Sequence, residues 1–84
     1  MKSFKDRVLD IVAKIPKGKT MTYKDVAMRA GSPGAARAVG SIMKANYRED
    51  VHCHRVIRSD GKIGDYNRGG QIEKIRKLKS EGAI

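Results

Sequence analysis

Apolar residues recur every three or four positions near the start of the chain, as they do on one face of a helix. Ser3 followed by Asp6 is typical of a helix start, and Pro16 and Gly18 end the pattern. The apolar positions are Phe4, Val8, Leu9, Val12 and Ile15. This pattern predicts a first helix whose apolar face belongs to the core.

A second helix is predicted to begin at Thr22, because Asp25 follows three residues later, as in a capping box. Gly31 marks the end of this helix. Its inner side is expected to carry Val26, Ala27 and Ala30.

A third helix is predicted to follow almost at once. Ser32 is expected to be its N-cap, with Pro33 at the first helical position, where a missing N–H costs nothing. The helix is expected to continue to about Asn46. Two helices joined by so short a turn predict a helix-turn-helix, in which the second helix usually enters a DNA groove.

The second helix of this pair carries unusually small side chains. Residues 34–41 are all Gly, Ala, Val or Ser apart from Arg37. A smooth helix with one arginine favours a shape-based contact with the minor groove over recognition of base edges in the major groove. Close packing against a neighbouring helix is the alternative explanation.

The next part of the chain predicts an extended segment, a turn and a loop. Residues 51–57 are rich in β-branched side chains and predict a short strand. Ser59-Asp60-Gly61-Lys62 is typical of a hairpin turn, and residues 64–70 contain too much glycine for regular structure.

A last helix is expected from about Gln71. Its predicted buried face consists of Ile72, Ile75 and Leu78, with Lys74, Arg76, Lys77 and Lys79 mostly on the outside. Together, these elements predict a mostly α fold: a small winged-helix-like helix-turn-helix domain with a short extended segment and hairpin that carry the site. We expect one domain spanning residues 1–84.

The charge of the chain indicates a polyanionic partner. Nineteen Lys and Arg against nine Asp and Glu give a formal net charge of +10. Nucleic acid is the first candidate, although a basic protein without a specific partner would show the same balance.

The single cysteine excludes an internal disulfide and suits a reducing compartment. The charged amino terminus does not fit a signal peptide, and no apolar run approaches membrane-spanning length. We therefore expect a cytoplasmic protein, or a nuclear one in a eukaryote, with no membrane partner.

His52, Cys53 and His54 are three adjacent metal-ligand types. In an extended segment neighbouring side chains point to opposite faces, so Cys53 is expected to face away from both histidines. We therefore expect no metal site and no cofactor.

Cys53 followed by His54 also fits an activated nucleophile, since the thiolate is the reactive form of cysteine and an imidazole can accept its proton. An inert buried cysteine is the alternative, and the spacing alone leaves both open.

Several motifs, in order and spacing, extend over almost the whole chain. They are residues 15–23 (IPKGKTMTY), 35–40 (AARAVG), 43–46 (MKAN), 53–57 (CHRVI) and 80–82 (SEG). This series resembles the carboxy-terminal domain of O6-alkylguanine-DNA alkyltransferases.

The resemblance implies a role for individual residues. Cys53 would take the alkyl group from guanine O6, with His54 acting as base through a water and Glu81 holding that histidine. Tyr23 would press on the phosphate of the target nucleotide and help guanine leave as a neutral base. Arg37 would fill the gap left by the flipped nucleotide.

The resemblance also implies which residues surround the flipped base. Asn46 would organise the hinge beside the nucleophile and is expected to be one of the catalytic residues. The DNA-binding residues are then Tyr23, Arg37, Ala35, Ala36, Gly40 and Met43. The base pocket would be lined by Met43, Val56, Tyr66, Asn67 and Arg68.

Three features depart from the family pattern. His52 stands where the family has proline, the loop at residues 66–70 is one residue longer, and the family's separate amino-terminal domain has no counterpart here. Alkyltransferase-like proteins also lack that domain, but they carry tryptophan at the cysteine position.

The resemblance therefore implies a stoichiometric DNA repair methyltransferase that binds duplex DNA containing O6-alkylguanine, flips the base and transfers the alkyl group irreversibly to Cys53. The alternative is a non-enzymatic lesion sensor that recruits nucleotide excision repair proteins. A sequence-specific helix-turn-helix regulator is a third possibility, against which the small residues around Arg37 argue. We expect a monomer.

Overall fold

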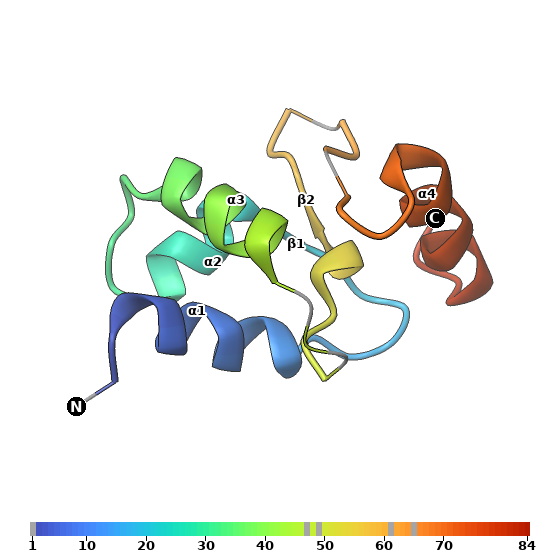
Figure 1. Ribbon diagram of the computed structural model, residues 1–84. Helices are drawn as coiled ribbons and strands as arrows, with labels where there is room; N and C mark the ends of the chain where they lie inside the picture. The colour runs from blue at the N-terminus through green and yellow to red at the C-terminus, as the bar shows by residue number, and fades with distance from the viewer. Residues whose placement is uncertain (1, 47, 49, 61, 65) are drawn as a thin grey trace.

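The computed structural model describes residues 2–46, 48, 50–60, 62–64 and 66–84 of the chain (Figure 1). Within these ranges the helices are α1 (Phe4–Ala13), α2 (Tyr23–Arg29), α3 (Ala36–Ala45) and α4 (Gly70–Ser80). A 3₁₀ turn, η1 (Cys53–Arg55), and two short strands, β1 (Met21–Thr22) and β2 (Val56–Ile57), complete the regular structure described. The mostly helical fold predicted from the sequence is confirmed.

The first two helices begin at the capping residues that the sequence indicates. Ser3 Oγ accepts a hydrogen bond from the Asp6 N–H at 3.1 Å. Thr22 Oγ1 accepts from the Asp25 N–H at 3.0 Å, and the Asp25 carboxylate accepts in return from the Thr22 N–H at 3.3 Å. Each bond satisfies an N–H that has no partner inside the helix, which fixes where α1 and α2 start.

The predicted start of α3 at Ser32 is wrong, because Ser32 belongs to the end of α2. Gly31 adopts a left-handed conformation with φ +92°, and the Ser32 N–H donates to the Ala27 carbonyl at 2.9 Å. This is the Schellman arrangement that closes a helix. The Ser32 carbonyl then accepts from the Ala35 N–H at 2.9 Å, so residues 32–35 form a turn and α3 begins at Ala36.

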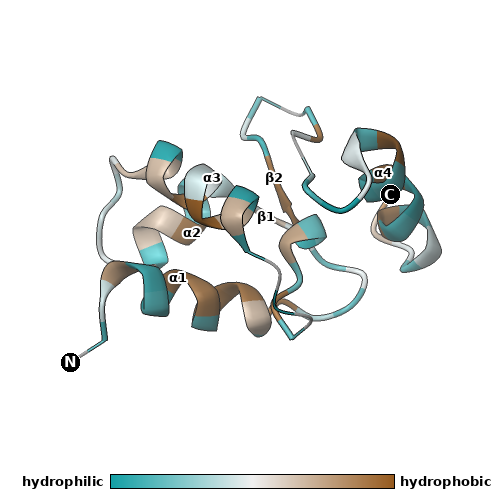
Figure 2. Ribbon diagram, in the orientation of Figure 1, coloured by the Kyte–Doolittle hydropathy of each residue, from teal (hydrophilic) through white to brown (hydrophobic). Residues whose placement is uncertain are grey.

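The core lies where α1, α2 and α3 meet, and their brown apolar faces point toward one another in Figure 2. The helix-turn-helix pair α2 and α3 is in direct contact, and α1 packs against both. The fully or nearly fully buried side chains of this core include Val8, Val12, Ile15, Val26, Ala27, Val39 and Val56. The face predicted for the first helix and the inner side predicted for the second are both confirmed.

A short parallel sheet joins this helical core to the second half of the chain. β1 pairs with β2 in the register Met21 with Val56 and Thr22 with Ile57. α2 starts directly after β1 and η1 ends directly before β2, so the sheet ties α2 to the segment that carries Cys53 (Figure 1).

The extended segment predicted over residues 51–57 is only partly correct. Cys53–Arg55 forms a 3₁₀ turn, closed by a 2.9 Å bond from the Arg55 N–H to the His52 carbonyl, and only Val56–Ile57 is a strand. Strict alternation of side chains therefore does not hold at Cys53. The Arg58 N–H donates to the Lys62 carbonyl at 3.0 Å across the predicted hairpin turn, whose Gly61 lies outside the described residues.

Helix α4 lies beyond the sheet, at the end of the molecule away from α1 (Figure 1). It begins within one residue of the predicted position, but its predicted faces need correction. Ile72 is 83% exposed, whereas Lys74 and Leu78 are both fully buried. Lys74 lies one helical turn before Leu78 on the inner face, where its amine meets the Tyr23 hydroxyl. Among the described residues, none of the helices has the length and apolar character needed to span a membrane.

Candidate functional site

Cys53 is buried, at 5% exposure, and lines a cavity of about 680 Å³. Its sulfur accepts a hydrogen bond from Asn46 Nδ2 at 3.4 Å and lies 3.7 Å from the Val51 carbonyl oxygen. The chain enters through a tight turn at His52, closed by a 3.0 Å bond from the Cys53 N–H to the Val51 carbonyl. The sulfur is thus held by side chain and backbone together.

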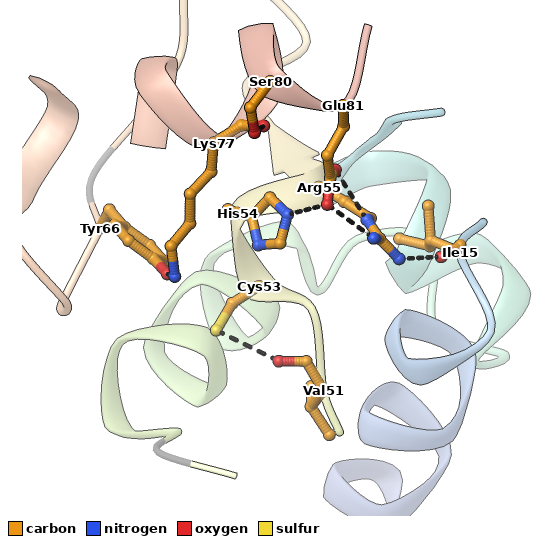
Figure 3. A network of polar contacts seen from close by, with 9 residues as sticks. All are labelled: Ile15, Val51, Cys53, His54, Arg55, Tyr66, Lys77, Ser80 and Glu81. Atoms are coloured by element: carbon orange, nitrogen blue, oxygen red, sulfur yellow. Dashed lines mark hydrogen bonds and ion pairs between the residues drawn. The ribbon is translucent and has the colours of Figure 1, made fainter. Parts of the chain in front are cut away.

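Behind Cys53, His54 is joined to Glu81 from the end of α4. His54 Nε2 lies 2.9 Å from Glu81 Oε2, and Figure 3 shows the imidazole between Glu81 and the cysteine. Burial, partly opposed by Glu81, lowers the pKa of His54, so the imidazole is neutral near pH 7. Because the carboxylate accepts a hydrogen bond from the Nε2–H group, the free lone pair of the neutral ring is on Nδ1.

Arg55 fixes this carboxylate from the other side. Its Nε and Nη2 donate to Glu81 Oε1 and Oε2 at 3.0 and 2.7 Å, and its Nη1 donates to the Ile15 carbonyl at 2.7 Å. Mainly through this hydrogen bonding, the pKa of Glu81 falls from 4.5 to about 2. The Glu81 carboxylate is therefore ionised near pH 7 and accepts the hydrogen bond from His54. Arg55 connects this network to Ile15, which follows α1.

Arg55 was not predicted as a site residue. The sequence does hold one indication, since Arg55 lies in a segment rich in β-branched residues, and an arginine buried there would need a carboxylate partner. Which carboxylate it would meet depends on the packing of α4, which the local sequence does not reveal.

The cavity is lined by residues of α2, α3 and η1 and of the loops on either side of Gly64. Among the predicted residues, its lining includes Tyr23, Ala36, Arg37, Gly40, Met43, Cys53, Tyr66 and Asn67. Lys24, Lys44 and Arg58 also line it, and Asp60 is the one acid among the described lining residues, so this part of the lining is basic. Such a basic lining favours an anionic partner.

The other predicted residues lie outside the described lining of this cavity. Asn46 contacts the Cys53 sulfur, His54 follows Cys53 and contacts Glu81, and Ala35 precedes α3. Val56 is fully buried in the core. Arg68 donates to the Arg48 carbonyl at 2.9 Å.

Two tyrosines form walls of the cavity, and each is reached by a lysine from α4. Lys74 Nζ lies 3.4 Å from the Tyr23 hydroxyl, and Lys77 Nζ lies 2.7 Å from the Tyr66 hydroxyl. Gly64 has φ +82°, and a Cβ there would come within 3.1 Å of the Tyr23 hydroxyl. The close passage of the loop beside Tyr23 therefore requires glycine.

The Asn67 side chain fastens the glycine-rich loop to the end of α3. Its Nδ2 donates to the carbonyls of Met43, Lys44 and Asn46 at 3.3, 2.7 and 2.7 Å. These carbonyls belong to the end of a helix, where backbone partners are few, and the Met43 carbonyl also accepts from the Asn46 N–H at 3.2 Å. Asn67 thus holds together two of the segments that form the cavity, namely α3 and the Tyr66 loop.

The two histidines beside Cys53 have ring centroids 6.2 Å apart. Within the part of the chain that the structure describes, no group of three or more His, Cys, Asp or Glu side chains is arranged to hold a metal ion.

Comparison with known proteins gives consistent results. Residues 3–83 match the family model described as 6-O-methylguanine DNA methyltransferase, DNA binding domain. A methylated-DNA–protein-cysteine methyltransferase of Methanothermobacter thermautotrophicus is 46% identical over 94% of this chain and 44% of its own length. The mouse protein of the same name is 48% identical over 95% of this chain and 39% of its own length. The chain thus spans less than half the length of these relatives.

Solved structures show the same architecture. The structure of S. pombe Atl1 with damaged DNA containing O6-carboxymethylguanine has a TM-score of 0.85 and 37% identity, covering 98% of this chain and 80% of Atl1. Mycobacterium tuberculosis OGT in complex with DNA has a TM-score of 0.87 and 40% identity, covering 96% of this chain and 49% of OGT. The resemblance found in the sequence is therefore confirmed, and the chain belongs to the family of 6-O-methylguanine DNA methyltransferase DNA-binding domains.

Proposed function

We propose that this chain binds duplex DNA through the minor groove, receives a flipped O6-alkylguanine in the cavity and transfers the alkyl group irreversibly to Cys53. The observation that carries the proposal is the position of Cys53 in the cavity lining, in contact with Asn46 and next to His54, which is paired with Glu81. Family membership supports the same chemistry.

The chemical step is a single displacement. The proton of the Cys53 thiol passes to His54, directly or through a water, and the sulfur attacks the alkyl carbon on guanine O6. A C–S bond forms as the C–O bond breaks, and its electron pair stays with the guanine. The guanine takes up one proton, with help from Tyr23, and leaves as a neutral base. The stable thioether ends the reaction after one turnover.

The surface of α3 supports the proposed mode of DNA binding. Arg37 is exposed and lines the cavity rim, where it can enter the space left by a flipped nucleotide. A Cβ added at Gly40 would meet no atom within 4 Å outside its own helix. The alternative explanation, that Gly40 is small for close packing inside the protein, therefore has no support at this position.

A lesion sensor that binds O6-alkylguanine without repairing it is the second candidate. The similarity to Atl1, of which this chain covers 80%, favours it. In that case the bound lesion would recruit nucleotide excision repair proteins, and Cys53 would remain unmodified.

Intact-mass measurement separates the two candidates. After incubation with excess O6-methylguanine duplex, we expect one methyl increment per wild-type chain, none in Cys53→Ala and slower transfer in His54→Ala. An unchanged wild-type mass together with tight lesion binding contradicts the enzyme and supports the sensor.

The contribution of Arg37 is measured in the Cys53→Ala background, where binding is separate from chemistry. Arg37→Ala should reduce the preference for lesion over undamaged duplex, because the wedge is needed only when a base is flipped. Lys79→Ala removes the same charge from an exposed position on α4 and should weaken binding to lesion and undamaged duplex equally. Equal effects of the two substitutions contradict the wedge.

A further inference from the structure

Lys77 projects from α4 toward the site. Its Nζ lies 2.7 Å from the Tyr66 hydroxyl oxygen and 5.2 Å from the centre of the Tyr66 ring (Figure 3). An ammonium group can only donate, so the phenol oxygen is the acceptor of this bond. The hydrogen bond therefore fixes the hydroxyl end of Tyr66, a cavity wall that is itself 8% exposed.

Tyr66 packs in turn against His54. The two ring centroids are 6.4 Å apart with an interplanar angle of 77°, which is an edge-to-face contact. Figure 3 shows Lys77 and Tyr66 on the side of the imidazole opposite Glu81. The histidine is thus held by Glu81 on one side and by the tyrosine on the other.

We propose that Lys77 is a positioning residue of this site, whose ammonium holds the Tyr66 ring against His54 and so sets the width of the cavity beside Cys53. The consequence for alkyl transfer rests on the function proposed above, whereas the packing of Tyr66 against His54 can be tested without DNA.

The charge of Lys77 adds a second effect on His54. The charged or titratable groups around this imidazole are Glu81, Arg55 and Lys77, with the His52 and Tyr66 rings at separations of 6.2 and 6.4 Å and Cys53 next to it in the chain. Burial is the main cause that lowers the pKa of His54, Glu81 acts in the opposite sense, and the positive charges of Arg55 and Lys77 lower it further. Removing Lys77 therefore raises the pKa of His54. The neutral base becomes scarcer at low pH, and the acid limb of the transfer rate moves to higher pH.

Three variants separate positioning from a general effect of charge. Lys77→Met keeps the aliphatic stem but loses the donor and the charge, and Lys77→Arg keeps both. Lys79→Met makes the same change at an exposed position on the same helix. NMR titration of the protein without DNA follows the His54 ring proton and the Tyr66 ring resonances, with His52→Gln used to assign the two histidines.

We expect Lys77→Met to raise the pKa of His54 and to shift the Tyr66 ring resonances, while Lys77→Arg and Lys79→Met stay close to wild type. In the Cys53→Ala background, Lys77→Met should weaken lesion binding by roughly tenfold, the effect of one lost charge-assisted hydrogen bond. The acid limb of single-turnover transfer should shift in the same direction as the His54 titration.

The proposal is overturned if Lys77→Met leaves the His54 titration and the Tyr66 resonances unchanged, or if Lys79→Met changes them as much. If wild-type protein transfers no alkyl group, the proposed function fails, but the NMR comparison still decides the role of Lys77.

Discussion

The carboxylate of Glu81 holds the site together, and Glu81→Gln measures how strongly. In the structure this group accepts two hydrogen bonds from Arg55 and one from His54, and its side chain is only 12% exposed. The fall of its pKa from 4.5 to about 2 corresponds to a stabilisation of the charged form by about 3 kcal/mol. The amide cannot neutralise Arg55, which remains buried. We therefore expect the variant to lose about 3 kcal/mol of unfolding free energy at pH 7, as when one partner of a buried ion pair is removed.

The dependence on pH identifies the cause of this loss. Because the pKa of Glu81 is lower in the folded state, its contribution is complete above the unfolded value of 4.5 and disappears as pH falls toward about 2. Urea unfolding followed by circular dichroism should therefore show wild type and Glu81→Gln converging between pH 4.5 and 2.

Glu73→Gln is the matched control. Its carboxylate lies 3.6 Å from exposed Arg76 on the same helix, and its removal should cost no more than about 0.5 kcal/mol. A loss below about 1 kcal/mol for Glu81→Gln at pH 7, or a difference from wild type that persists unchanged at pH 2, refutes this account of the network.

Asn67→Ala should cost about 1–2 kcal/mol in urea unfolding, because three carbonyls at the end of α3 lose the side-chain amide that bonds to them, and Asn67→Asp should cost more because its carboxylate would face them. His52→Pro should leave the melting temperature unchanged or higher, because the φ of −87° and ψ of +67° at His52 suit a tight turn that proline also adopts. A loss of more than about 1 kcal/mol in the free energy of unfolding contradicts this. Gly64→Ala should cost about 1–3 kcal/mol and shift the Tyr23 ring resonances, because the added Cβ falls 3.1 Å from the tyrosine hydroxyl at φ +82°. Gly40→Ala should instead stabilise the protein by up to about 1 kcal/mol, since it meets open space within a helix, yet it should weaken binding to duplex DNA if α3 enters the minor groove.

The starts of α1 and α2 were predictable from the sequence because the interactions that decide them are local. Ser3 and Thr22 each cap a backbone N–H only three residues away. The same reasoning failed at Ser32. This residue was predicted to cap the start of the third helix, but its N–H closes the end of α2. Two local motifs compete there, and the left-handed Gly31 decides between them.

The segment around Cys53 shows a similar limit. Its β-branched content predicted a strand, but β1 pairs only with Val56 and Ile57, and the residues before them curl into a 3₁₀ turn. The side-chain alternation used to separate Cys53 from the histidines therefore has no basis at that position. Strand pairing between residues more than thirty apart in sequence is decided by the assembled fold.

By itself the sequence determined the fold class and the family, because capping residues, apolar periodicity and the Cys53-His54 motif all act over a few neighbouring positions. Only the tertiary structure decided which face of α4 is buried. Apolar periodicity favoured Ile72, yet the helix turns Lys74 and Lys77 inward, since their amines meet the two tyrosine hydroxyls from distant segments. A long lysine side chain can cover apolar surface with its stem while its amine reaches a polar partner, so its burial depends on a partner that no local pattern reveals.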